Sequence, residues 1–436
     1  MNCYTKICKF QLFFLFLNEM CNTLKDLGIL FFRFLIKLQI VIFYINKFIS
    51  MKKPLTLLWL LGVSSVLLAW CSCNQSTEKS ESTNVLSQEN VTMETQRTNY
   101  GELKETPIEK EDLVLTEEWD KVFPKSDKVN HRKVTFVNRF GITLAADLYE
   151  PKDAEGKLPA IAVAGPFGAV KEQSNGLYAQ EMAERWFMAL AFDPSFMWES
   201  GGKPRNLASP DINTEDFQAA VDFLMMQDNV DADKIGIIWI CGWWGIALNA
   251  ASIDTRVKAT VVSTMYNMSR VAHYWYFDAN SEDDIYAAKE SVNAQRLVDM
   301  KNWKYALAWW VVDPLPEDAA DFVKDYYAYY KTERWYHPRS LNSNSWWNVT
   351  SSLSLMNTPQ LAYTNEIRNA VLIIHGEKAH SRYFWEDAYN DMVKDSKYTE
   401  NKELLIVSGA THTDLYDQKD IIPFDKIESF MRENME

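Results

Sequence analysis

The stretch that most constrains the fold runs from Ile235 to Ala251. It begins as an apolar, β-branched run, which is typical of a strand buried on both faces, and it ends as a small-residue helical run. Cys241 stands at the corner between the two. A strand–corner–helix segment lifts the corner side chain out of the sheet and directs the N-terminus of the following helix at it. The pattern therefore predicts that Cys241 is a nucleophile held on a sharp turn.

Two backbone features of this corner favour chemistry at the sulfur. The positive end of the helix stabilises negative charge, so it favours the thiolate over the thiol. The N–H of Gly242, directly after the cysteine, would face an oxyanion formed during attack on a carbonyl. The alternative is a buried structural cysteine, because free Cys packs well as a small apolar residue. After Cys73 the sequence contains no cysteine except Cys241, so no disulfide framework is expected in the folded part.

Apolar runs farther along the chain predict an α/β fold. Predicted strands cover 131–137, 142–149, 158–164, 187–192, 235–240, 257–263, 370–374 and 403–407. Predicted helices cover 178–185, 213–227, 246–251 and 383–394, with a last helix from residue 424. Because strands and helices alternate, we expect a mostly parallel sheet with helices on both faces.

The alternation is interrupted between residues 270 and 367. This segment is rich in aromatic residues and contains two predicted helices, 282–301 and 317–331. Its aromatic side chains either pack the insert onto the sheet or line a pocket. Because the insert follows the elbow end of the sheet, we expect it to form a helical lid over the site.

Charge and motif content exclude several classes of partner. The chain has 436 residues, with 45 basic and 59 acidic side chains and a net charge of -14, which argues against nucleic-acid binding. No histidine, cysteine or carboxylate set has the spacing of a metal site, and no glycine-rich phosphate loop or dinucleotide fingerprint is present. We therefore expect neither a metal nor another cofactor.

The region before the domain predicts a targeting segment. Met51–Lys53 is a charged start and Leu55–Ala69 an apolar core, so residues 51–73 read as a signal peptide. The sequence around Cys71 resembles a bacterial lipoprotein signal, which predicts lipidation of Cys71 and anchoring to a membrane of the cell envelope. Cys73 is a second candidate, and an ordinary secretory signal is the alternative.

Two further segments flank this signal. Residues 1–50 are interpreted as a non-native upstream extension, with a membrane-associated segment as the alternative. Residues 74–112 are rich in Ser, Thr, Glu, Asn and Gln and predict a disordered linker. The folded domain is expected over residues 113–436.

The tryptophan content is unusual. The chain has 15 glycines and 16 tryptophans, whereas average usage would give about 30 glycines in this length. Trp70, Trp198 and Trp239 stand where a glycine or another small residue is expected. One hypothesis is that these are UGA glycine codons translated as tryptophan under the wrong genetic code. The alternative is a decayed or truly tryptophan-rich protein.

Four motifs carry a resemblance to a known family. They are Ile-Cys-Gly-Trp at 240–243, Phe-Asp at 192–193 with Glu-Ser-Gly-Gly at 199–202, Ile-His-Gly-Glu-Lys at 374–378 and Gly-Ala-Thr-His at 409–412. From about Lys133 to its end, the chain resembles α/β-hydrolases of the dienelactone-hydrolase-like group. The resemblance implies an α/β-hydrolase fold with an eight-stranded sheet, and the order nucleophile, acid, histidine along the chain.

The resemblance also implies roles for individual residues. Cys241 matches the nucleophile, and His412, which follows the last strand, matches the general base. The acid of the family would fall at Ala379, so Glu377, the nearest carboxylate, is the first candidate. Asn267 is the second candidate for orienting the imidazole, and a Cys–His dyad without an acid is the third possibility.

A second oxyanion donor is expected in the loop after the strand 158–164. Pro166 has no N–H, so the donor predicted beside Gly242 is Phe167. Together these features predict a hydrolase that cleaves a small ester, thioester or lactone through an acyl-cysteine intermediate. The alternatives are a non-catalytic binding lipoprotein of the same fold and a peptidase.

Overall fold

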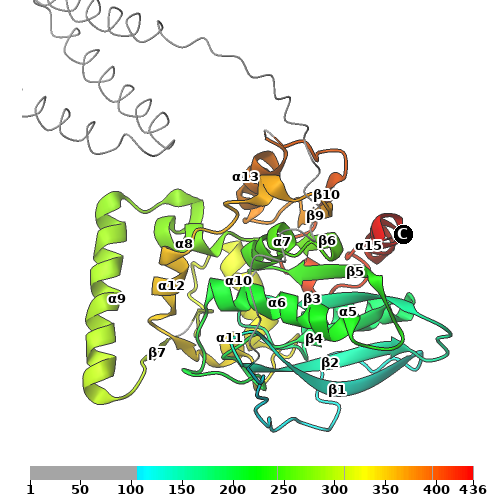
Figure 1. Cartoon of the computed structure of the whole chain (residues 1–436). Helices are drawn as coiled ribbons and strands as arrows, with labels where there is room; N and C mark the ends of the chain where they lie inside the picture. Colours follow the sequence, from blue (N-terminus) through cyan, green and yellow to red (C-terminus); the bar gives the residue numbers. More distant parts are fainter. Residues whose placement is uncertain (1–105, 243, 309, 395, 436) are drawn as a thin grey trace, which may run out of the picture. The chain divides into compact units, whose positions relative to one another are not determined.

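The computed structural model describes residues 106–242, 244–308, 310–394 and 396–435, and its centre is one eight-stranded sheet (Figure 1). The strands are β1 (Val129–Val137), β2 (Thr143–Pro151), β3 (Leu158–Ala164), β4 (Met188–Phe192), β5 (Val230–Ile240), β6 (Val257–Ser263), β9 (Ala370–Gly376) and β10 (Lys402–Val407). Their spatial order is β1-β2-β4-β3-β5-β6-β9-β10. Only the pairs β1–β2 and β2–β4 are antiparallel, so the predicted mostly parallel eight-stranded sheet is confirmed.

Helices pack onto the sheet in two groups. Helices α6 (Pro210–Met225) and α7 (Trp244–Ile253) contact each other and β5, whereas α5 (Ser174–Glu184) and α15 (Phe424–Met435) form a second contacting pair. Helix α13 (Arg382–Val393) lies against β9. The part of β5 nearest the elbow is entirely buried, as its unbroken apolar run requires between two helical layers.

Helix α6 begins three residues before its predicted start at 213. Pro210 occupies its first turn, where the missing N–H of proline is no loss. The buried side chain of Asn213 accepts a hydrogen bond from the N–H of Ser209 at 2.9 Å, instead of capping a later start.

The insert between β6 and β9 consists of short helices and one small hairpin. Its elements are α8 (Met268–Tyr274), η2 (Tyr276–Asp278), α9 (Glu282–Asn302), β7 (Leu307–Ala308), α10 (Asp321–Lys331), α11 (Leu341–Asn344), β8 (Trp347–Asn348), α12 (Ser351–Asn357) and η3 (Thr364–Glu366). Helix α9 lies along the margin of the domain, at the left of Figure 1. Both helices predicted for residues 270–367 are present as α9 and α10, and α10 starts at Asp321 rather than 317.

The predicted N-terminal segments lie outside the described residues. This applies to the extension 1–50, the signal peptide 51–73, the lipidation site Cys71 and nearly all of the linker 74–112, all of which stay predictions. Within the described part of the chain, no helix combines the length and apolar character that crossing a membrane requires.

Candidate active site

Cys241 lies on a strained corner at the end of β5. Its φ is 62°, in the left-handed region that residues other than glycine rarely adopt. The N–H of Cys241 donates to the carbonyl oxygen of Ser263 in β6 at 2.8 Å, and α7 begins only three residues later, at Trp244. The corner therefore has the strand, the positive φ and the following helix of a nucleophile elbow.

Two backbone N–H groups point at the sulfur of this corner. They belong to Gly242 and Phe167, and both form hydrogen bonds with Cys241. The two segments approach so closely that a Cβ added to Gly242 would lie 2.7 Å from the Cβ of Phe167. Position 242 thus requires glycine, and the two N–H groups lie where the sequence predicted a pair of oxyanion donors.

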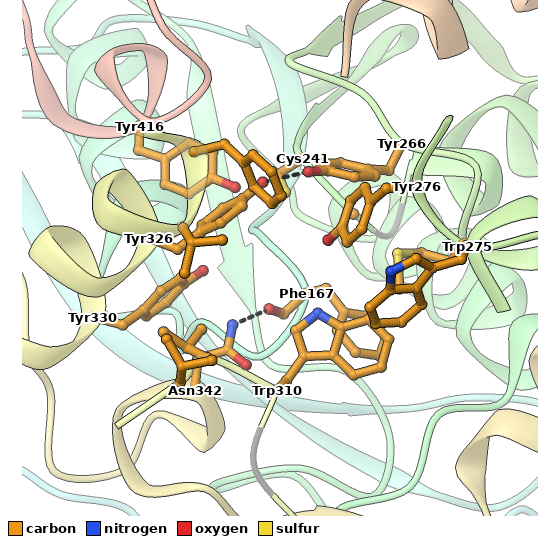
Figure 2. A pocket seen from close by; sticks show the side chains of 16 residues that line it. Phe167, Cys241, Tyr266, Trp275, Tyr276, Trp310, Tyr326, Tyr330, Asn342 and Tyr416 are labelled. Atoms are coloured by element: carbon orange, nitrogen blue, oxygen red, sulfur yellow. Dashed lines mark hydrogen bonds between the residues drawn. The ribbon is translucent and has the colours of Figure 1, made fainter. Parts of the chain in front are cut away.

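The Phe167 backbone is held by contacts from the insert and from a buried ion cluster. Asn342 in α11 donates to the carbonyl oxygen of Phe167 at 2.5 Å, as Figure 2 shows. The Phe167 ring stacks on Trp347 with 4.0 Å between centroids. Farther along the same loop, the buried ammonium of Lys171 pairs with Glu172 at 2.7 Å and Asp193 at 3.0 Å. Asp193, from the motif at 192–193, therefore supports the loop.

His412 meets Cys241 from the loop after β10. Its Nε2 lies 3.2 Å from the sulfur of Cys241 and 2.9 Å from the hydroxyl of Tyr416, one helical turn farther along the chain. The ring is fully buried. The structure thus brings together the two residues that the sequence assigned as nucleophile and base, and it adds Tyr416, which the sequence analysis did not single out.

Glu377 does not contact His412. Its carboxylate is solvent-exposed and accepts hydrogen bonds from the Ser408 hydroxyl at 2.9 Å and the Gly409 N–H at 2.8 Å. Both hydrogen bonds lower the pKa of Glu377, and the bond from the Gly409 N–H has the larger effect. The structure contradicts the expectation that Glu377 is the acid of a triad, because this carboxylate braces the turn before His412 instead.

Asn267 is also not placed to orient the imidazole. It is the N-cap of α8, and its side-chain oxygen accepts a hydrogen bond from the N–H of Arg270 at 2.8 Å. This is an ordinary structural use of asparagine at a helix start. The second candidate from the sequence is therefore contradicted as well.

The partner of the His412 Nδ1 is a serine that sequence reasoning missed. The Ser381 Oγ lies 2.7 Å from Nδ1 of His412 and 3.2 Å from Nε2 of His375. All three side chains are buried. The only sequence signal was negative, namely Ala379 at the position where the family would place its acid.

Burial keeps the resting site neutral. It raises the pKa of the Cys241 thiol to about 12, against hydrogen bonds from Tyr416, Gly242 and Phe167 that lower this pKa. Burial also holds the pKa of His412 well below its usual value, and the His380 and His375 imidazoles lower this pKa further. Burial therefore opposes the stabilisation of a thiolate that the helix N-terminus was expected to provide. At neutral pH a thiol faces a neutral imidazole.

An aromatic pocket of about 570 Å³ opens above the sulfur. Figure 2 shows Cys241, Phe167 and Tyr416 on its wall together with side chains of the insert. The aromatic residues that the insert contributes are Trp275, Tyr276, Trp310, Phe322, Tyr326 and Tyr330. No Asp, Glu, Lys or Arg is found among the described residues that line it.

The aromatic residues of helix α10 have two different roles, in the pocket wall and in packing. Tyr326 and Tyr330 line the pocket, whereas Tyr329 packs against Trp335 and Tyr416. The insert therefore forms both a packing layer and most of the pocket wall. Among the described residues, no group of three His, Cys, Asp or Glu side chains is arranged to hold a metal ion.

The sheet order, the elbow and the histidine after the last strand define the class of the protein, the α/β-hydrolase superfamily. The crystal structure of the α/β hydrolase GrgF from Penicillium sp. sh18 shares this fold, with a TM-score of 0.58 and 18% identity over 70% of this chain and 99% of that chain. The family model of the X-Pro dipeptidyl-peptidases (S15 family) matches residues 141–413. The match covers more than half of the chain, which therefore belongs to this family of hydrolases.

Two relatives add detail. The uncharacterized protein PA2218 of Pseudomonas aeruginosa is 55% identical over 325 residues, which are 74% of this chain and 86% of that protein. The crystal structure of PA2218 matches this chain with a TM-score of 0.71, and the match covers 99% of the chain in that crystal structure. Thiohydrolase aneE of Aspergillus aculeatus is 31% identical over 136 residues, which are 31% of this chain and 42% of that protein.

Proposed function

We propose that the protein hydrolyses an ester, thioester or lactone of an apolar carboxylic acid through an acyl-Cys241 intermediate. One observation carries this proposal. The sulfur of Cys241 lies 3.2 Å from Nε2 of His412 and faces two backbone N–H groups at the wall of an apolar pocket. Nucleophile, base and oxyanion donors are the groups that acyl transfer requires.

The reaction follows from this geometry. As the sulfur attacks the carbonyl carbon, the thiol proton moves to Nε2 of His412. The carbonyl oxygen becomes an oxyanion that accepts hydrogen bonds from the N–H groups of Phe167 and Gly242. Collapse of the tetrahedral intermediate releases the alcohol or thiol, which takes the proton from the imidazolium. Water then attacks the acyl-cysteine with the same imidazole as base, and the thiol is restored.

The pocket supports an apolar acyl group. Its lining is largely aromatic, so an alkyl or aryl acyl chain would bury its surface without leaving a charge unpaired. The raised pKa of the Cys241 thiol disfavours a preformed thiolate, which suits reactive acyl groups as substrates. The partial likeness to thiohydrolase aneE agrees with this class of substrate. The grouping with dienelactone hydrolases, based on motifs, forms part of the same proposal.

A peptidase is the second candidate function, favoured by the family match over residues 141–413. A dipeptidyl-peptidase must bind the charged amino terminus of its substrate, and a buried ammonium needs a carboxylate partner. The described lining of the pocket provides no such carboxylate.

We also propose that a lipid anchor at Cys71 attaches the protein to a membrane of the cell envelope. The remaining alternative to an enzyme is a non-catalytic binding lipoprotein of the same fold.

A substrate panel tests this function. We expect the purified full chain to hydrolyse butyryl and phenylacetyl thioesters and p-nitrophenyl esters, and to leave Ala-Pro-p-nitroanilide intact. Mass spectrometry of protein quenched during turnover should find the acyl group on the peptide that contains Cys241.

The His412→Gln variant is the matched control, because it removes the base and retains the sulfur. His412→Gln should neither hydrolyse the substrates nor form the acyl-Cys241 adduct at a rate comparable to that of the wild type. Cleavage of the Ala-Pro anilide in preference to the esters would establish the peptidase instead. Binding of the esters without any turnover or adduct would leave the non-catalytic alternative.

A further inference from the structure

We propose that Ser381 and His375 replace the missing acid as positioning residues that fix the tautomer of His412. This inference rests on the proposed function for its kinetic consequence, but the tautomer itself is a property of the folded chain. It says which group donates in each hydrogen bond of a line that runs from the Gly376 carbonyl through His375, Ser381 and His412 to the sulfur of Cys241.

The direction is set at the His375 end of the line. Nδ1 of His375 lies 3.1 Å from the carbonyl oxygen of Gly376, and a carbonyl oxygen can only accept, so Nδ1 carries the hydrogen. Burial lowers the pKa of His375 to about 4, and this effect outweighs the hydrogen bonds to the backbone of Gly376 and Met265, which raise the pKa. The ring is therefore neutral at pH 7, and its Nε2 is a bare acceptor.

Ser381 then passes this direction to His412. Its hydroxyl lies 3.2 Å from Nε2 of His375 and donates its single hydrogen there. Its oxygen is left as the acceptor for the Nδ1–H of His412 at 2.7 Å. With the hydrogen on Nδ1, the Nε2 of His412 has a lone pair that faces the Cys241 thiol at 3.2 Å and the Tyr416 hydroxyl at 2.9 Å. This is the tautomer that a general base requires.

A neutral line of this kind suits the buried site. An acid beside a fully buried imidazole would bring a charge into surroundings that disfavour it. A serine and a second histidine orient the ring without a net charge, and all three side chains are excluded from solvent. They do not stabilise an imidazolium as a carboxylate would, so the substrate must itself be reactive, as a thioester is.

Nitrogen-15 NMR of the histidine rings tests the tautomer directly. In the uniformly labelled full chain we expect His412 to carry hydrogen on Nδ1 and none on Nε2, with its signals assigned by their loss in His412→Gln. Ser381→Ala should leave His412 mainly in the tautomer with hydrogen on Nε2 and so lower kcat/KM for a thioester about 10²-fold, since a wrong tautomer costs up to about 10⁴-fold at such sites. Ser381→Thr, which keeps the hydroxyl, should restore both.

The outcomes separate this proposal from the proposed function. A wild-type His412 with hydrogen on Nε2 overturns the positioning role, whether or not any variant folds. Unchanged kcat/KM in a folded Ser381→Ala also overturns it, and leaves the acyl-cysteine mechanism intact. Wild-type protein with the expected tautomer but no turnover on any ester would refute the function and not the hydrogen-bond line.

We infer, from independent observations on the backbone, that glycine stands at Trp186, Trp198, Trp275 and Trp303 in the protein as its own cells make it. Tryptophan makes up 16 of the 436 residues. Yet in the described part of the chain it supplies four of the twelve non-glycine residues at positive φ. A bulky residue rarely adopts this conformation, whereas glycine does so without strain.

Trp186 occupies a helix end where glycine is the usual residue. It follows α5 with a φ of 65°. Its N–H donates to the carbonyl of Ala183 at 3.1 Å, and the N–H of Phe187 donates to the carbonyl of Met182 at 3.2 Å. These two bonds form a Schellman motif, in which the residue at position 186 is left-handed and most often glycine.

The other positions follow the same logic. Trp303 ends α9 in the left-handed conformation, with φ 51° and ψ 38°. Trp275 ends α8 with φ 62° and ψ -172°, a region that is essentially restricted to glycine. Trp198 has a φ of 47° next to the glycine-rich 199–202 turn, which agrees with the hypothesis from the sequence.

Contacts of the rings do not explain these residues. Trp186, Trp275 and Trp303 are 50%, 51% and 89% exposed, so none of the three indoles is fully buried. The buried indole N–H of Trp198 has no hydrogen-bond partner in the described structure. Trp239, also suspected from the sequence, lies in β5 with an equally unpartnered N–H, but its backbone is not left-handed. Trp275 lines the pocket, so glycine there would enlarge the space for an acyl chain.

Peptide mass spectrometry of the protein isolated from its own cells tests this inference. Peptides that cover positions 186, 198, 275 and 303 should be lighter by the mass difference between tryptophan and glycine. Trp119 is the matched control, because its indole N–H donates to the Phe123 carbonyl at 3.1 Å and its backbone is ordinary. It should be found as tryptophan in the same digest. Tryptophan at the four positions, or UGG codons there, would overturn the inference.

Discussion

Replacing Cys241 by alanine is expected to abolish ester and thioester turnover while the protein remains folded. The substitution removes one sulfur atom, and its methyl group fits the space that the sulfur leaves. The attacking atom is lost, so kcat/KM should fall by about 10⁴-fold or more, towards the residual that oxyanion donors and binding alone supply. Turnover is measured with the best ester of the panel, and folding by the melting temperature, which should stay near that of the wild type.

The control for this variant lies in the same pocket. Val311→Ala removes apolar surface from the wall without touching the reacting atoms, so it should raise KM more than it lowers kcat. Ester hydrolysis that persists in Cys241→Ala at the wild-type rate would show that another group attacks the carbonyl.

The same thiol predicts a distinctive pH dependence. Because burial raises its pKa to about 12, only a small fraction is thiolate at pH 8, and that fraction grows tenfold with each pH unit. The rate of alkylation of wild-type Cys241 by iodoacetamide should therefore keep rising through pH 10. A plateau near pH 7 would indicate a thiolate–imidazolium pair and contradict the neutral resting site.

The sequence predicted the parts of the site that local patterns determine. The apolar run that ends at Ile240, the single cysteine after it and the following small-residue helix define the elbow without reference to the rest of the chain. Likewise, Pro166 has no N–H, which left Phe167 as the donor predicted in the loop after β3. These features are short-range consequences of strand and turn chemistry, and so they are visible in the sequence.

The partner of His412 could not be predicted in this way. Glu377 and Ser381 lie four residues apart on the segment that follows β9, and a sequence does not say which side chain turns inward. The structure turns Glu377 to solvent and Ser381 to the imidazole. The burial that raises the pKa of Cys241 was not visible in the sequence for a related reason, because it depends on residues far apart along the chain.

The second large effect that we expect is a gain in stability from glycine at the strained tryptophans. A left-handed conformation costs a residue with a Cβ about 1–2 kcal/mol, and the region of Trp275 up to about 3 kcal/mol. The larger conformational freedom of glycine in the unfolded chain reduces this gain in the free energy of unfolding. The triple variant Trp186→Gly, Trp275→Gly, Trp303→Gly should therefore raise the melting temperature by about 5 °C or more, as measured by calorimetry.

Alanine variants at the same three positions separate backbone strain from the loss of the rings. Alanine removes the indole but keeps the Cβ that makes positive φ unfavourable, so it should recover little of the gain. Trp119→Gly should lower the melting temperature, because its ring packs edge-on against Phe123 with 5.8 Å between centroids and its N–H is bonded. If glycine at the three positions destabilised the protein as it does at 119, ring contacts and not backbone geometry would govern these sites, and tryptophan would be their natural residue.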